Sequence, residues 1–199
     1  MKSLINLIMN YKLKINIVTI LTASFPILCL AYGKGYNLPP ILLLITALLF
    51  IKEAKNIQYT RDTKLVIFSF LFYFSVHVFS LLIHNGKISD IDQPSRIVLA
   101  IPIFLLLLRY PPKFNWLINS MVIGSYISGL SAIICSYYYH QNRAFTNDNT
   151  IFFLKGFMPI QSGNMAMTLG IISLVITIYH LKNREHLLFI ISLFGSIFG

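Results

Sequence analysis

Charged side chains are scarce in this sequence. Asp, Glu, Lys and Arg together make up 11% of its 199 residues, whereas hydrophobic residues make up 56% and the mean hydropathy is +0.73. Soluble globular domains carry about 25% charged residues. The composition therefore excludes an ordinary soluble domain and predicts a membrane protein, whose helices satisfy their own backbone hydrogen bonds within the bilayer.

Negative charge is scarcer than positive charge. The chain has six acidic residues against 16 Lys and Arg, which gives a formal net charge of +10. A basic protein that binds nucleic acid usually gathers its basic residues on one patch or stripe. Here they are scattered through the short segments between apolar runs. We therefore predict no nucleic-acid partner and attribute the basic residues to membrane topology.

Cysteine is almost absent, because the chain has only Cys29 and Cys135. Both lie within apolar runs, and they form neither a CxxC motif nor the spacing of a metal site. We interpret them as small apolar residues. They give no information about the redox state of the compartment.

Apolar runs are abundant, and a helix needs about 20 apolar residues to cross a bilayer. The sequence predicts about six complete spans and a seventh that is interrupted at Gly199. Their expected ranges are 15–32, 41–51, 65–83, 97–108, 114–137, 165–181 and 187–199. The expected fold is an all-α, multi-pass transmembrane helix bundle with one membrane domain, residues 1–199. Because the last run is not closed by a polar flank, we expect the amino-terminal part of a longer protein.

The distribution of basic residues predicts the orientation. With the amino terminus in the cytoplasm, eleven basic residues fall on the inner side and five on the outer side. The inner residues are Lys2, Lys12, Lys14, Lys52, Lys55, Arg61, Lys64, Arg109, Lys113, Lys182 and Arg184, and the outer ones are Lys34, Lys87, Arg96, Arg143 and Lys155. Cytoplasmic loops carry the excess of Lys and Arg. Loops 52–64, 109–113 and 182–186 are therefore predicted to be cytoplasmic, and loop 140–163 to lie on the opposite side.

Small and polar residues recur at helical spacing. Small residues at four-residue intervals let neighbouring backbones approach closely. They are Ser120, Gly124 and Ser128 in the fifth run and Ser162, Ala166 and Gly170 in the sixth, and a polar face in the third run consists of Tyr73, His77, Ser80 and His84. For His77 we favour a hydrogen bond to a neighbouring helix over a role in acid–base chemistry.

Arg96 lies where a polar segment meets an apolar run that is short for a bilayer. Run 97–108 has 12 residues, about 18 Å as an α-helix, against a hydrocarbon core of about 30 Å. An arginine drawn toward hydrocarbon costs about 2.5–3.5 kcal/mol unless it pairs, snorkels or lines a wet cavity. Arg96 is therefore a candidate anion-binding residue. Asp90 and Asp92 could pair with it, but we favour a role for them in capping the following helix.

Residues 92–102, with the sequence DQPSRIVLAIP, resemble the first half of the O-antigen ligase family. A loop with Arg143 ahead of an expected turn at 159–163, and short spans capped by basic residues, add to the resemblance, which covers most of the chain. It implies a bacterial inner-membrane enzyme of lipopolysaccharide biosynthesis. Such an enzyme transfers a finished polysaccharide from undecaprenyl diphosphate to a sugar of the lipid A core, among membrane lipids and without nucleotide, metal or other cofactor.

The outer-side cations are the candidate ligands of the diphosphate. Guanidinium groups suit the charge that grows on phosphate oxygens when a diphosphate leaves, and the candidates are Arg96, Arg143 and, as a weaker one, Lys155. The alternative is that each of them only anchors a helix end or contacts lipid headgroups. The general base proposed for the family is a histidine in its second half, beyond Gly199. No catalytic residue is therefore assigned in this chain.

Three other functions remain open. An O-antigen polymerase belongs to the same superfamily and has a similar architecture. A transporter or channel would normally place ionisable groups deep within several spans, whereas here only His77 is clearly deep. A non-catalytic assembly or anchoring subunit would need no arginine site. Loss of glycan transfer on substitution of Arg96 and Arg143, with normal membrane insertion, would distinguish the enzyme from these alternatives.

Overall fold

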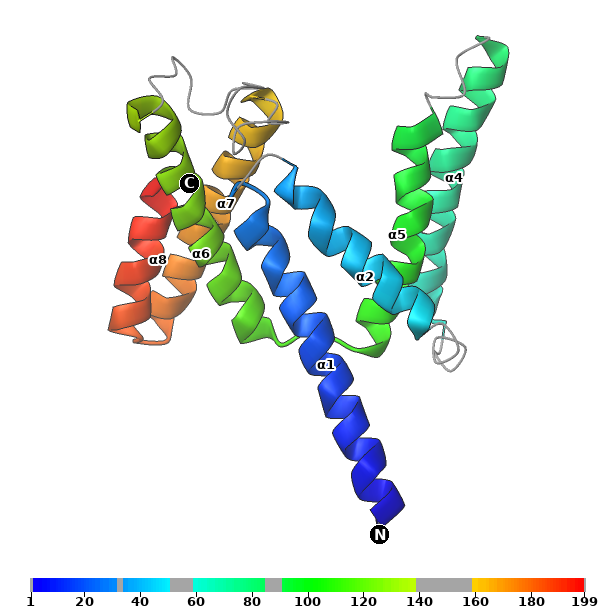
Figure 1. The fold of residues 1–199 in the computed structure, drawn as a ribbon, viewed down its shortest axis with the longest axis horizontal. Coiled ribbons are helices and arrows are strands. Elements are labelled where there is room, and N and C mark those ends of the chain that lie inside the picture. Colours follow the sequence, from blue (N-terminus) through cyan, green and yellow to red (C-terminus); the bar gives the residue numbers. More distant parts are fainter. Residues whose placement is uncertain (1, 32–33, 51–58, 85–90, 139–158, 199) are drawn as a thin grey trace. The chain divides into compact units, whose positions relative to one another are not determined.

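The structure is a computed structural model that describes residues 2–31, 34–50, 59–84, 91–138 and 159–198. Regular structure in these ranges is helical throughout (Figure 1). The elements are α1 (Lys2–Leu28), η1 (Gly35–Asn37), α2 (Leu38–Leu49), α4 (Arg61–Ile83), α5 (Asp92–Arg109), α6 (Phe114–Ile133), the π-helical turn η3 (Ile134–Tyr138), α7 (Pro159–Lys182) and α8 (His186–Phe198). The predicted all-α fold is confirmed for the described residues, and the described part of each predicted apolar run lies mainly in a helix.

Four of the described helices are long and apolar enough to cross a membrane. They contain the segments Tyr11–Leu28, Arg61–Ile83, Phe114–Ile133 and Ile160–Lys182. Segments Gly35–Leu49 and His186–Phe198 are apolar but shorter, and α5 carries Asp92, Arg96 and Arg109 within its 18 residues. The protein is therefore a membrane protein with four candidate spans by length and composition.

The boundaries of α7 differ from the prediction at residues 159–163. The expected turn at 159–163 is wrong, because these residues form the first turns of α7. Proline suits this position, since its fixed φ matches the helix and its missing N–H would have no partner in the first turn. Gly163 is accommodated within the helix with open space around it.

The chain divides into two compact units. The first comprises 1–41 and 112–199, and in it α6 packs against α1, α7 and α8, while α7 and α8 form a hairpin. The second comprises 42–111, and in it α4 and α5 pack against each other as a hairpin. Within each unit, helices that follow one another closely in sequence lie side by side (Figure 1).

Small residues of α6 make the close helix contacts that their spacing predicted. Ser120, Ser125 and Ser128 are buried, as are Gly124 and Gly129. A Cβ atom added at Gly124 would lie 2.5 Å from the backbone oxygen of Pro26 in α1. Only glycine therefore allows the two backbones to approach this closely, and the prediction is confirmed at this residue.

Hydroxyl groups connect the helices of the first unit. The Ser125 hydroxyl in α6 lies 3.1 Å from the backbone oxygen of Leu169 in α7, to which it can donate. The Tyr126 hydroxyl donates to the backbone oxygen of Ile191 in α8 over 2.6 Å. Each such interhelical bond in a membrane is worth about 0.6 kcal/mol on average. Cys29 is buried against Leu30 and Leu169, as expected of a small apolar residue, whereas the side chain of Cys135 lies outside the described residues.

Candidate functional site

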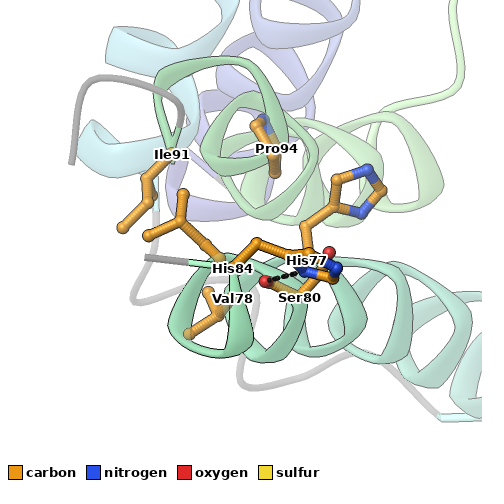
Figure 2. Close-up of a pocket in the computed structure, with 7 residues that line it drawn as sticks. His77, Val78, Ser80, His84, Ile91 and Pro94 are labelled. Atoms are coloured by element: carbon orange, nitrogen blue, oxygen red, sulfur yellow. Dashed lines mark hydrogen bonds between the residues drawn. The ribbon is translucent and has the colours of Figure 1, made fainter. Parts of the chain in front are cut away.

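The end of α4 and the start of α5 enclose a groove of about 250 Å³ within the second unit (Figure 2). Its polar side chains come from α4, and the start of α5 closes it with apolar ones. The lining residues are His77, Val78, Ser80, Leu81, His84, Ile91 and Pro94. The polar face predicted for the third apolar run is therefore real, and three of its four residues line one groove.

Two imidazole rings line this groove, and each bonds through Nδ1 to a backbone oxygen four residues earlier. Nδ1 of His77 lies 3.0 Å from the backbone oxygen of Tyr73. Nδ1 of His84 lies 2.8 Å from the backbone oxygen of Ser80 (Figure 2). A carbonyl oxygen only accepts hydrogen bonds, so Nδ1 carries a proton in both rings. When such a ring is neutral, its Nε2 is an acceptor for a hydroxyl group. Both bonds stay within α4, so the bond to another helix expected for His77 is not the one it makes here.

Tyr73, the fourth residue of the predicted polar face, packs its ring against that of His77. Their ring centroids are 4.2 Å apart, with a tilt of 39° between the planes. Together with the bond from Nδ1, this contact restricts the orientation of the imidazole. The restriction arises because residues four positions apart lie on the same helical face.

Arg96 forms an ion pair with Asp92 in the first turns of α5. Nη2 of Arg96 donates to Oδ2 of Asp92 over 2.7 Å, and the side chains are 61% and 67% exposed. Such an exposed pair one helical turn apart contributes about 0.3–0.5 kcal/mol. Its main effect is therefore to orient the guanidinium, which keeps four of its five N–H donors without a partner among the described residues.

The expected capping role of Asp92 is wrong. The N-cap residue of α5 is Ile91, which makes no side-chain capping bond, and Asp92 is the first residue of the helix. Its carboxylate binds Arg96 instead. A carboxylate in the first helical turn is also favourable next to the positive end of the helix dipole. Asp90, the other acidic candidate, lies outside the described residues.

The structure brings only part of the predicted site together. Arg143 and Lys155 lie outside the described residues, so only Arg96 of the three diphosphate candidates has a described position. Arg96 does not line the groove: at about 100° per residue, it lies on a different side of α5 from Ile91 and Pro94. Groove and arginine are thus neighbours at the same end of the α4–α5 hairpin, on two sides of one helix.

Two polar features were not anticipated from the sequence. His180 is buried at the end of α7, and its Nδ1 lies 2.5 Å from Oε2 of Glu185. Arg109, at the end of α5, has a buried Nε without a hydrogen-bond partner in the described structure. Neither could be recognised from spacing, because both depend on how the ends of helices pack. In the described ranges no three His, Cys, Asp or Glu side chains gather where they could hold a metal ion.

No protein-family model matches the chain, and no solved structure does. Over 170 residues the chain is 31% identical to an uncharacterized protein of Haemophilus influenzae. The match covers 85% of this chain and 40% of the Haemophilus protein, so the chain spans about two fifths of that relative's length.

Proposed function

We propose that the protein is a membrane glycan transferase of the O-antigen ligase type. It transfers polysaccharide from undecaprenyl diphosphate to the lipid A core, with the diphosphate held at Arg96. The observation that carries the proposal is the Asp92–Arg96 pair, which orients a largely exposed guanidinium at the amino-terminal end of an apolar helix. Resemblance of residues 92–102 to the ligase family supplies the reaction.

Transfer of a sugar from a lipid diphosphate is favoured by a fixed cation next to the leaving diphosphate. In the transfer, the bond between the sugar's anomeric carbon and a phosphate oxygen breaks, and a bond from that carbon to an acceptor hydroxyl oxygen forms. The electron pair stays on the diphosphate, and the hydroxyl proton goes to a base that has not been located in this chain. Arg96 would bind the charge that grows on the diphosphate through two parallel N–H donors, and the helix dipole at the start of α5 would add to this.

The proposal includes a topology. We infer that α2, α5 and α8 enter the membrane together with the four long spans, which gives seven membrane helices, with the amino terminus in the cytoplasm of a bacterial inner membrane. Two observations support this. The seven helices follow the predicted apolar runs, and eleven of the 16 basic residues then lie on the cytoplasmic side. Arg96 lies on the periplasmic side in this topology.

A deletion strain tests the proposal and separates it from the polymerase alternative. Loss of a ligase leaves full-length polysaccharide on its lipid carrier and lipid A core without it. Loss of a polymerase instead leaves lipid A core that carries one repeat unit. Chromatography of both lipid fractions distinguishes these outcomes. Wild-type glycan patterns in both fractions of the deletion strain would refute either enzyme and favour a transporter or an assembly subunit.

A further inference from the structure

A second depression lies at the opposite end of the α4–α5 hairpin from Arg96. It is a crevice of about 90 Å³ between the end of α2 and the second half of α5. Its walls are mostly apolar and include Ala47, Phe50, Leu105 and Leu106, and Arg109 also lines it. Phe50 packs edge-on against Tyr110, with ring centroids 6.1 Å apart, and thereby links the two helices at this end.

The guanidinium of Arg109 has an unmet hydrogen-bond donor in this crevice. Its Nε is buried and has no hydrogen-bond partner among the described residues. A buried donor without an acceptor costs about 1–3 kcal/mol, and more when it belongs to a charged group. The negative end of the helix dipole at the last turn of α5 offsets part of this cost for the positive charge. The Nε hydrogen still lacks an acceptor among the described residues, and an oxygen atom of a ligand in the crevice would supply one.

Two properties of the crevice specify the ligand. The apolar walls suit a short stretch of hydrocarbon, and the guanidinium suits an anionic oxygen, preferably of a phosphate. A membrane supplies one molecule with both properties, a phospholipid whose headgroup lies level with the helix ends.

We propose that this crevice binds one anionic glycerophospholipid. Its phosphate accepts hydrogen bonds from Arg109, including one from Nε, and part of an acyl chain lies between Ala47 and Leu105. The site is independent of the proposed glycan transfer, since Arg96 lies 13 residues earlier in α5, about 20 Å along the helix axis. The lipid would hold the end of α2 against α5.

Native mass spectrometry of the purified protein in detergent tests the site. We expect retention of one phosphatidylglycerol at a lipid concentration at least tenfold below that needed for phosphatidylcholine. Arg109→Gln should abolish this preference. Arg109→Lys, which keeps the charge but lacks Nε, should weaken phosphatidylglycerol binding severalfold. Ala47→Leu should weaken it as well, because it fills the crevice without changing the charge.

The control is Arg61→Gln, which removes a positive charge at the same end of the hairpin without touching the crevice. It should change phosphatidylglycerol retention less than twofold. Wild-type retention in both Arg109→Lys and Ala47→Leu would overturn the proposal, as would equal weakening by Arg61→Gln. If millimolar inorganic phosphate displaces the lipid completely, the crevice is a site for a free anion and the lipid assignment is wrong.

Discussion

Nη2 of Arg96 and Oδ2 of Asp92 lie 2.7 Å apart, one turn from each other at the start of α5. Both side chains are largely exposed, so the pair contributes little to stability. It does restrict the guanidinium to one side of the helix. An arginine that only anchors a helix among headgroups has no need of such a partner, whereas one that binds a phosphate benefits from being oriented beforehand.

Gly124→Ala should destabilise the first unit. The new Cβ would lie 2.5 Å from the backbone oxygen of Pro26, and a backbone atom cannot move aside as a flexible side chain could. We expect a net loss of about 1–3 kcal/mol, as for other overpacked contacts. Thermal unfolding of the detergent-purified protein measures it.

Gly163→Ala is the matched control. This glycine is also helical, in α7, but nothing lies within 4 Å of the added Cβ. Alanine should therefore stabilise the protein by up to about 1 kcal/mol through its higher helix propensity. Equal effects of the two substitutions would mean that α1 and α6 do not pack at Gly124.

Arg184→Gly should stabilise the turn between α7 and α8. Arg184 has φ 59°, a left-handed conformation in which non-glycine residues are strained. The turn is a Schellman motif, with backbone bonds from Glu185 to His180 and from Arg184 to Leu181. Relief of the strain should be worth about 1 kcal/mol in the unfolding free energy.

Arg184→Ala distinguishes strain from charge at this position. It removes the guanidinium but keeps a Cβ at the same φ, so it should give no comparable gain. A similar stabilisation in both variants would assign the effect to the lost positive charge instead.

The orientation of the chain predicts reporter activities. Alkaline phosphatase is active only outside the cytoplasm, so fusions after Lys113 and Lys182 should be inactive and a fusion after His84 active. This follows from the excess of basic residues at the inner helix ends. The reverse pattern would place Arg96 in the cytoplasm and exclude periplasmic transfer at that residue.

Much of the fold could be predicted because the positions of membrane helices follow from runs of apolar residues that are continuous in the sequence. Runs of apolar residues gave the helices, and the spacing of Ser120, Gly124 and Ser128 gave the packing face of α6. Helix ends were less accurate. A proline such as Pro159 is compatible both with a turn and with the first position of a helix, and the local sequence does not decide between them.

The candidate site was only partly predictable for a related reason. The ion pair of Arg96 with Asp92 is a contact between residues four apart, and such pairs can be inferred from sequence. The groove at His77 and the crevice at Arg109 require knowledge of which helix packs beside α4 or α5. Their lining residues come from segments separated by turns and loops. A local sequence pattern does not show that these segments lie side by side.

Substitution of Arg96 by lysine tests the central claim most directly. The measurement is the fraction of lipid A core that carries polysaccharide in cells whose only copy of the gene encodes Arg96→Lys, with Arg61→Lys as control and membrane levels of the protein matched. Lysine keeps the charge but cannot grip a phosphate at two points, and one lost charge-assisted bond is worth about 1.5–3 kcal/mol. We predict a fall in the transfer rate of at least about tenfold for Arg96→Lys and no change for Arg61→Lys. A wild-type fraction in the Arg96→Lys cells would contradict the account and leave Arg96 as a helix anchor.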